Sequence, residues 1–404
     1  MIRTTKIKKE RDEMTKFYEK YYVERRKTDS LKWDGMEEKF GTNDLLPLWV
    51  ADMDFKVPEK VQQKMTERIN HGVFGYSIAS EDYYQSVIDW QKRRHGVKLS
   101  SEWIRFGTGV VNGLHYLIQC FTNEEDSVMI FSPVYYPFYD VVKENKRSLV
   151  VSELVIKNGR YEIDFDDMEK KIKDNAVKAI IFCSPHNPVG RVWTKNELDK
   201  VNKICQENDV FVISDEIHQD FIAKGQTFTS FLNVDGIDEK KLVILNSASK
   251  SFNLASLLHS HILIPSEELR GDYDAFIKSR VNNPPSLMGM IATQTSYTDG
   301  EEWLNELNQT IDANFSLMKK LFNEQLPKAT VYDKEGTYLS WIDLGEYCTP
   351  KNIEEIVQEK AKIAIDYGSW FGKTSGSFIR INLATHPKNI EKAVNALTQA
   401  INNS

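Results

Sequence analysis

Four short runs of apolar residues set the pattern of the first two thirds of the chain. They cover residues 127–131, 177–183, 210–214 and 242–245, and a polar or aromatic cluster follows each of them directly. Runs of this length between turn residues predict buried strands. Helical spacing lies between some of the runs, most clearly over residues 194–208. Alternating strands and helices predict an α/β fold with a mostly parallel sheet covered on both faces.

The pattern changes after residue 264. Apolar positions over 301–325 follow helical spacing, as they do over 353–363 and 386–401, whereas 337–344 and 377–384 read as strands. Residues 281–286 read as a linker or loop. A chain of 404 residues is too long for one simple core. We therefore predict a large domain over 51–285 and a smaller α+β domain over 286–404, to which residues 1–50 also belong.

Polar or aromatic side chains stand where the predicted strands end. These are Tyr135, Asn187, Asp215, Ser247 and Lys250. Each has an ordinary explanation by itself, since Asn187 and Asp215 could start turns and Tyr135 could be a core residue. In an open α/β sheet, however, ligands bind beyond the carboxyl ends of the strands. Because such groups follow all four predicted strands, we predict that these side chains converge on one cavity.

Lys250 follows the last buried run almost at once. It could be a solvated loop lysine, as most lysines are. It could instead be a functional amine, because a desolvated lysine shifts its pKa readily and forms Schiff bases with carbonyl compounds. The neighbouring strand ends favour the second interpretation.

A glycine-rich segment opens a predicted helix at Gly109, Val110 and Val111. Free N–H groups at a helix start favour an anion, typically a phosphate. The signal is weak alone, because the segment lacks the lysine of a P-loop and the GxGxxG spacing of a dinucleotide site. On the small domain, Arg380 alternates with isoleucines. It is either a surface arginine or a bidentate clamp for a carboxylate.

Composition narrows the classes of function. The net charge is −7 and no large basic patch invites nucleic acid. No apolar run approaches the length of a membrane span, and the charged first 32 residues do not resemble a signal or transit peptide. The four cysteines show neither metal-ligand spacing nor a disulfide framework. We expect a soluble, cytoplasmic protein that binds neither nucleic acid, membrane nor metal.

The set of groups suits a phosphorylated aldehyde cofactor that stacks on an aromatic ring. Lys250 would bind the aldehyde as a Schiff base, and Asp215 would keep the ring nitrogen protonated. Asn187 would donate to the phenolic oxygen and Tyr135 would stack on the ring. The amides of residues 109–111, with Ser247 and Ser249, would bind the phosphate.

Three motifs carry a resemblance to a known family. They are Ser-Pro-His-Asn187-Pro-Val-Gly-Arg, Ser-Asp215-Glu-Ile-His218 and Ser247-Ala-Ser249-Lys250-Ser-Phe-Asn. With them, the chain resembles the fold-type I pyridoxal-5′-phosphate (PLP) enzymes of the class I/II aminotransferase superfamily. Together with the segment Leu-Trp-Val-Ala-Asp-Met-Asp-Phe (residues 48–55), it is similar to the cystathionine β-lyase/C–S lyase branch of the MalY/PatB type.

The resemblance implies further roles. His218, where typical aminotransferases carry tyrosine, would touch the oxygen side of the cofactor. Tyr76 would reach the phosphate of the neighbouring subunit's site, which implies a homodimer. Arg380 would bind the α-carboxylate of the substrate. The chain departs from many relatives at Leu258, where they have a phosphate-binding arginine, and His259 or backbone amides would compensate. It departs also at Ser256, where relatives often have glycine.

The implied reaction is an α,β-elimination from an amino-acid thioether, such as cystathionine or a cysteine S-conjugate, to a thiol, pyruvate and ammonia. Lys250 would abstract the α-proton. An aminotransferase on the same scaffold loses the same proton, so the cofactor motifs do not separate the two activities. A regulatory PLP-binding protein is the alternative of a different class, and the intact Lys250, Asp215 and Asn187 speak against it. The motifs do not specify the thioether.

Overall fold

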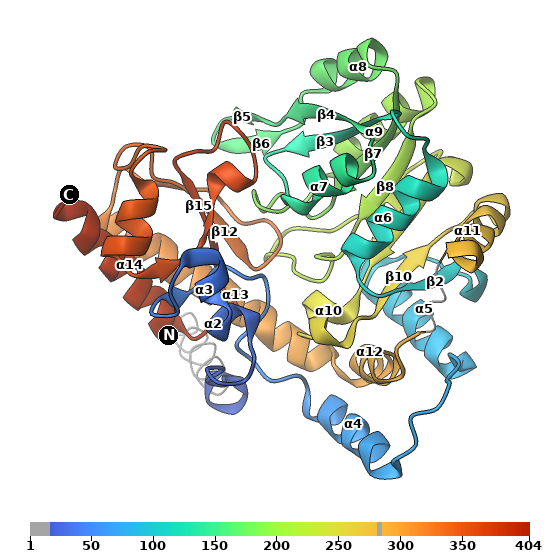
Figure 1. Cartoon of the computed structure of the whole chain (residues 1–404), viewed down its shortest axis with the longest axis horizontal. Coiled ribbons are helices and arrows are strands. Elements are labelled where there is room, and N and C mark those ends of the chain that lie inside the picture. Colours follow the sequence, from blue (N-terminus) through green and yellow to red (C-terminus); the bar gives the residue numbers. More distant parts are fainter. Residues whose placement is uncertain (1–16, 281–284) are drawn as a thin grey trace, which may run out of the picture.

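A computed structural model describes residues 17–280 and 285–404 (Figure 1). Its central feature is a seven-stranded sheet of order β2-β10-β9-β8-β7-β3-β4. The strands in this order are Ile104–Gly107, Ser260–Leu263, Leu242–Asn246, Phe211–Asp215, Val177–Cys183, Ser127–Ser132 and Ser148–Glu153. Neighbours from β9 to β4 pair in parallel, and β10 pairs antiparallel with both β9 and β2. The predicted α/β fold with a mostly parallel sheet is confirmed.

Helices cover both faces of this sheet because its strands are apolar on both sides. Alternate residues of β8, such as Val212 and Ile213, enter two separate cores. One core includes residues of α6, α7 and α11, and the other includes residues of α5, α8 and α9. Their bounds are Val110–Phe121, Pro137–Glu144, Glu267–Arg280, Glu81–His95, Phe165–Asp174 and Lys195–Glu207. The β5–β6 hairpin, Val155–Lys157 and Arg160–Glu162, follows β4.

A second sheet of order β11-β12-β15-β14 follows in the last third of the chain. Its strands are Thr330–Val331, Leu339–Asp343, Phe378–Asn382 and Asp366–Tyr367. The helices of this part are α12 (Leu287–Asp299), α13 (Glu301–Gln325) and α14 (Pro387–Asn402). The helix predicted over 301–325 thus matches α13. The division into domains at residues 50 and 285 stays a prediction.

The N-terminal elements pack beside the C-terminal ones (Figure 1). They are α2 (Leu31–Asp34), α3 (Met36–Phe40) and β1 (Leu46–Pro47), and α4 (Glu59–His71) follows them. Strand β1 pairs in parallel with β13, Ile363–Ala364. The helix predicted over 353–363 was therefore wrong at its end. The chain forms a π-helical turn over Glu355–Lys360 and then a strand, because Ile363 has a distant partner in Leu46 that local periodicity cannot reveal.

The linker prediction for 281–286 falls mainly on residues 281–284, which lie outside the described residues. In the parts of the chain that the structure describes, no helix combines the length and the apolar character needed to cross a membrane. Those same parts hold no cluster of potential metal ligands, and the four cysteines are free thiols.

A buried arginine fixes the loop that follows β7. Arg191 is 2% exposed, and its Nε lies 2.9 Å from a carboxylate oxygen of Glu335. Its Nη2 lies 2.9 Å from Glu197, and Nη1 donates to the carbonyl of Tyr161. The guanidinium therefore joins the loop to the hairpin β5–β6 and to the segment before β12.

We expect Arg191→Leu to lower the free energy of unfolding by about 3 kcal/mol, the low end of the cost of breaking a buried ion pair. The variant removes a charge partner of Glu335 and Glu197, although Arg160 stays paired with Glu335. Denaturant unfolding measures this change. Lys203→Ala is the matched control, since its pair with Glu207 spans 3.8 Å between exposed side chains and such a pair contributes under about 1 kcal/mol. Equal losses in the two variants would contradict this account of the loop.

Candidate active site

Lys250 lies in the short helix α10 (Ala248–Ser251), which begins directly after β9. Ser247 caps this helix, because its Oγ accepts from the N–H of Ser249 at 3.0 Å and donates to the carbonyl of His259 at 2.7 Å. The chain therefore turns at the edge of the sheet, where the apolar run of β9 ends and α10 begins. The Lys250 amine leaves the turn and donates to the carbonyl of Ala51 at 2.6 Å.

Most of the predicted site residues line one cavity of about 270 Å³ beyond the carboxyl ends of the parallel strands. The predicted residues in its wall are Gly109, Val110, Val111, Tyr135, Asn187, Asp215, His218, Ser249 and Lys250. They come from α6 and from the segments that follow β3, β7, β8 and β9. The parallel arrangement brings these strand ends to the same edge, and this places the amine, carboxylate, amide and aromatic groups together.

Three predicted residues lie outside the cavity wall. Ser247 is hydrogen-bonded to two residues of the wall, Ser249 and His259. Arg380 is 2% exposed on β15 and reaches the site through Asn187. Tyr76 is fully exposed, in the irregular segment between α4 and α5.

Arg380 is held by groups from three elements. Nη1 donates to Oδ1 of Asn187 at 2.9 Å, Nη2 donates to the carbonyl of Trp49 at 3.0 Å, and Nη2 also pairs with the buried carboxylate of Asp366. The Nε group has no partner among the described residues. The interpretation of Arg380 as a surface residue is therefore wrong, because both faces of β15 are covered.

Burial shifts the pKa values of Lys250 and Asp215 in the directions that favour the uncharged amine and the uncharged carboxyl. It lowers the pKa of the Lys250 amine to about 8, while Asp52 opposes the shift, Arg380 adds to it and Asp215 opposes it. Burial likewise raises the pKa of the Asp215 carboxyl to about 7, against the N–H of Ile217 and the charge of Lys250. An amine that loses its proton near neutral pH suits both Schiff-base formation and proton abstraction.

His218 is neutral in this setting. Burial, followed by the positive charges of Lys250 and Arg380, holds the pKa of its imidazole well below the usual value. Its ring lies edge-on to Tyr338 with centroids 5.7 Å apart, and its buried Nδ1 has no hydrogen-bond partner within residues 17–280 and 285–404.

The start of α6 forms a cradle at the other end of the cavity. Gly109 precedes the helix with φ +146°, a conformation open to glycine, and no side chain caps the first turn. The first N–H groups of the helix are thus available to an anion. The structure also supports this cradle with Asn112, whose amide donates to Oγ1 of Thr108 at 2.9 Å.

Leu258, which stands where many relatives have a phosphate-binding arginine, lies outside the wall of the main cavity. Leu258 is 57% exposed, and it lines a neighbouring cavity together with Ser256 and Leu257. His259 does line the main cavity, but burial lowers the pKa of its ring to about 4 and its Nε2 lies 2.6 Å from the hydroxyl of Tyr83. Phosphate binding by backbone amides of α6 therefore remains the simpler prediction.

The sequence interpretation missed several members of the wall. These are Ala51, Thr108, Asn112, Cys183, Ile217 and Ala255. The spacing of Thr108 and Asn112 at the helix start was a usable signal. Ala51 contributes a backbone carbonyl, for which a sequence holds no signal.

These residues fit PLP on physical grounds. The cavity joins an amine of lowered pKa, a buried carboxyl of raised pKa, an amide beside a guanidinium, a phenol ring and an uncapped helix start. Each matches one part of the cofactor: the aldehyde, the ring nitrogen, the phenolic oxygen, the ring face and the phosphate.

Comparison with known proteins agrees with this geometry. The family model for aminotransferase class I and II matches residues 43–397. The chain belongs to the aminotransferase class I and II family. It is 36% identical to the cystathionine beta-lyase PatB of Bacillus subtilis, over 89% of this chain and 93% of that protein. The predicted resemblance to the family and to its lyase branch is confirmed.

Two solved structures are similar to this chain over nearly its whole length. Cystalysin from Treponema denticola, which contains PLP, has a TM-score of 0.91 and 36% identity, with coverage of 94% of this chain and 98% of that one. The PLP-bound C–S lyase of Staphylococcus hominis has a TM-score of 0.89 and 34% identity, with coverage of 94% and 96%. The fold-type I assignment is thereby confirmed.

Proposed function

We propose that this protein is a PLP-dependent carbon–sulfur β-lyase that cleaves amino-acid thioethers, such as cystathionine or cysteine S-conjugates, to a thiol, pyruvate and ammonia. The observation that carries the proposal is the cavity in which the Lys250 amine, the Asp215 carboxyl and the Asn187 amide meet. The match to C–S lyases over almost the full chain supports this reaction over the others that the fold allows.

PLP, when bound, supplies an electron-withdrawing ring that stabilises negative charge at the substrate Cα. Asp215 would hold the proton on the ring nitrogen, for which its buried position at the end of β8 is suited. Asn187 would donate its amide to the phenolic oxygen, and Arg380 fixes the orientation of that amide through a bond to Oδ1. Tyr135 would cover one face of the ring.

Lys250 is the proposed proton-transfer group. Its amine would take the proton from the substrate Cα, because burial lowers its pKa to about 8 and so makes the neutral amine far more abundant at neutral pH than in an ordinary lysine. The carbonyl of Ala51 accepts from the same amine and would orient it. Loss of the proton prepares the bond between Cβ and sulfur for cleavage.

Arg380 would bind the α-carboxylate of the substrate. Its unpartnered Nε and its remaining Nη1 hydrogen are available for this contact, while Asn187, Trp49 and Asp366 hold the rest of the guanidinium. A guanidinium already oriented by such contacts loses little entropy when it binds a second carboxylate.

We also propose a homodimer in which Tyr76 contacts the phosphate in the partner subunit's site. The end of α4 and the segment that carries Tyr76 expose large apolar side chains, which are Ile69 on the helix and Val73, Phe74 and Ile78 beyond it. An exposed apolar stretch of this kind is typical of a subunit interface.

Hybrid dimers test the role of Tyr76. We expect Tyr76→Phe to weaken PLP binding about tenfold or more, the cost of a lost hydrogen bond to a charged group. A hybrid of one Tyr76→Phe subunit and one Lys250→Ala subunit should regain one site of wild-type affinity, since its intact Lys250 and Tyr76 come from different chains. Tyr84→Phe is the control. A hybrid site as weak as the Tyr76→Phe homodimer would contradict the proposal.

The lyase and the aminotransferase differ in their need for an acceptor. We expect steady release of thiol and pyruvate from cystathionine or an S-alkyl cysteine when no 2-oxo acid is added. An absolute requirement for a 2-oxo acid, with the sulfur retained in the product, would favour the aminotransferase. A panel of thioethers of increasing size, assayed in the same way, identifies the preferred substrate.

A further inference from the structure

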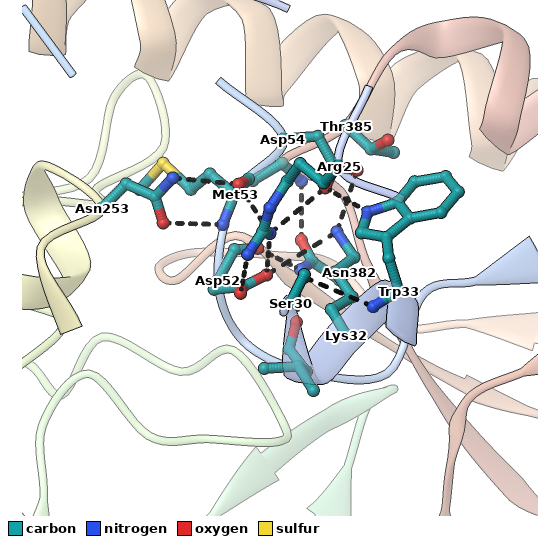
Figure 2. Close-up of polar contacts among 12 residues, drawn as sticks. Arg25, Ser30, Lys32, Trp33, Asp52, Met53, Asp54, Asn253, Asn382 and Thr385 are labelled. Carbon is teal, nitrogen blue, oxygen red and sulfur yellow. Dashed lines mark hydrogen bonds and ion pairs between the residues drawn. The ribbon is translucent and has the colours of Figure 1, made fainter. Parts of the chain in front are cut away.

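Residues 49–54 are here called the strap. Its two acids contact Arg25 and Lys32 of the N-terminal segment (Figure 2), and its Ala51 lines the cavity. The strap holds two acidic residues, Asp52 and Asp54. Neither takes part in the proton transfers proposed for Lys250 and Asp215. Both are nevertheless bound by positive charges from the N-terminal segment.

The backbone of the strap is clamped by side chains that are remote in sequence. Nδ2 of Asn382 donates to the carbonyls of Val50 and Asp52, both at 2.6 Å. Asn253 accepts from the N–H of Met53 at 3.0 Å and donates to its carbonyl at 2.9 Å. Asn253 lies just beyond α10 and Asn382 lies on β15, so both halves of the molecule fix the strap (Figure 2).

The strap in turn contacts the catalytic amine. The carbonyl of Ala51 accepts from the Lys250 amine at 2.6 Å and from the hydroxyl of Tyr338 at 2.7 Å. Asp52 follows Ala51 directly. After burial, which lowers the pKa of Lys250, the negative charge of Asp52 is the strongest influence, and it raises that pKa.

The other charged or titratable groups near Lys250 come from different elements. Asp215 at the end of β8 raises its pKa, and Arg380 on β15 lowers it. The pKa of His218 is lowered by burial first and then by the positive charge of Lys250. Of these groups, Arg380 is paired with the buried carboxylate of Asp366, whereas Asp52 is paired with a side chain of the N-terminal segment.

Arg25 is the partner that neutralises Asp52. Its Nη1 and Nη2 donate to Oδ1 and Oδ2 of Asp52 at 2.7 and 2.8 Å, a bidentate pair. Nη1 also donates to the carbonyl of Met53 at 3.0 Å. The amine of Lys32 is 4.0 Å from Asp52 and serves Asp54 instead, at 3.0 Å. Bidentate arginine pairs fix the geometry of a carboxylate as well as its charge.

We propose that Arg25 is a positioning residue of the active site, which holds both carboxylate oxygens of Asp52 and thereby limits how strongly that negative charge acts on the Lys250 amine. Without Arg25, the full charge of Asp52 favours the protonated amine. Without Asp52, the protonated amine loses a stabilising charge. The two losses therefore act in opposite directions, which a purely structural role of the strap does not predict.

The test is a pH titration of the visible absorption of PLP in the holoenzyme. Because an anion near the amine also favours a protonated nitrogen on the cofactor linkage, the same signs hold there. We expect Arg25→Gln to move the midpoint to higher pH and Asp52→Asn to move it to lower pH, each by about 0.5 unit or more. The double variant should match Asp52→Asn if Arg25 influences the amine through Asp52 rather than through its contacts with the carbonyl of Met53 and, at 3.4 Å, with Asp54.

Two further variants test whether the shift depends on the geometry of Arg25 and is specific to that residue. Arg25→Lys keeps a positive charge without the bidentate geometry and should give a smaller alkaline shift, which also carries the test if Arg25→Gln does not fold. Arg26→Gln is the matched control, because the side chain of this neighbouring arginine donates to the carbonyls of Asn43 and Leu45 and stacks on Trp33. It should leave the midpoint unchanged.

Shifts of Arg25→Gln and Asp52→Asn in the same direction would overturn the inference, as would an Arg25→Gln shift that persists in the Asp52→Asn background. The inference rests on the proposed function only in that PLP binds at Lys250. A wild-type protein without a visible cofactor band would therefore overturn both, whereas a normal band with shifts of equal sign would overturn the inference alone.

Discussion

Lys250→Ala is expected to abolish turnover of thioethers, with a loss of kcat of at least about 10⁴-fold. The variant removes one amine with two roles, because the Lys250 amine both holds the cofactor and moves the substrate proton. Among the described residues that line the cavity, Lys250 is the only lysine. Borohydride reduction followed by peptide mass spectrometry measures the link directly, since wild type should carry the cofactor mass on the peptide with Lys250.

Lys241→Ala is the matched control for this variant. Lys241 precedes β9, at the opposite end of the strand from Lys250, and its amine pairs with Asp209 at 2.8 Å. Its replacement should leave both the reducible link and the rate intact. A cofactor mass on a different peptide, or turnover retained by Lys250→Ala, would show that the central residue is wrongly assigned.

Asp215→Asn is expected to lower kcat by about 10²–10³-fold, the usual cost of removing one preorganised electrostatic group. An amide cannot hold the proton on the ring nitrogen as a carboxylate does, and the ring then withdraws electrons less strongly. Steady-state rates with a thioether at saturating PLP measure the effect, so that weaker cofactor binding does not enter it.

Glu216→Gln provides the comparison for Asp215. This neighbouring acid is equally buried, but its carboxylate accepts from the N–H of Phe231 at 2.8 Å and from Oγ of Ser214 at 3.2 Å, outside the cavity wall. We expect its replacement to affect stability more than rate. Rates that fall equally in both variants would contradict the role assigned to Asp215.

The strand ends explain why much of the site could be predicted from the sequence. Asn187, Asp215 and Lys250 each follow a buried apolar run, and parallel strands must place their carboxyl ends at one edge of the sheet. This rule needs only the order of elements along the chain. It identified the amine, the carboxylate and the amide before any distance was known.

The remaining parts depend on contacts that leave no local signal. The bond from Lys250 to Ala51 spans 199 residues and ends on a backbone carbonyl. The burial of Arg380 follows from Asp366 and from the strap, neither of which an alternating strand pattern reveals. The pairing of β13 with β1 likewise overrode a helical pattern. Tertiary partners, and not propensities, decided these features.

The central claim is that the protein breaks a carbon–sulfur bond with no acceptor. One measurement tests it most directly: thiol and pyruvate released from S-methylcysteine by a known concentration of active sites, without any 2-oxo acid. The account predicts equal amounts of thiol and pyruvate that rise linearly through many turnovers per site. A reaction that stops after one equivalent per site and releases no thiol would contradict it.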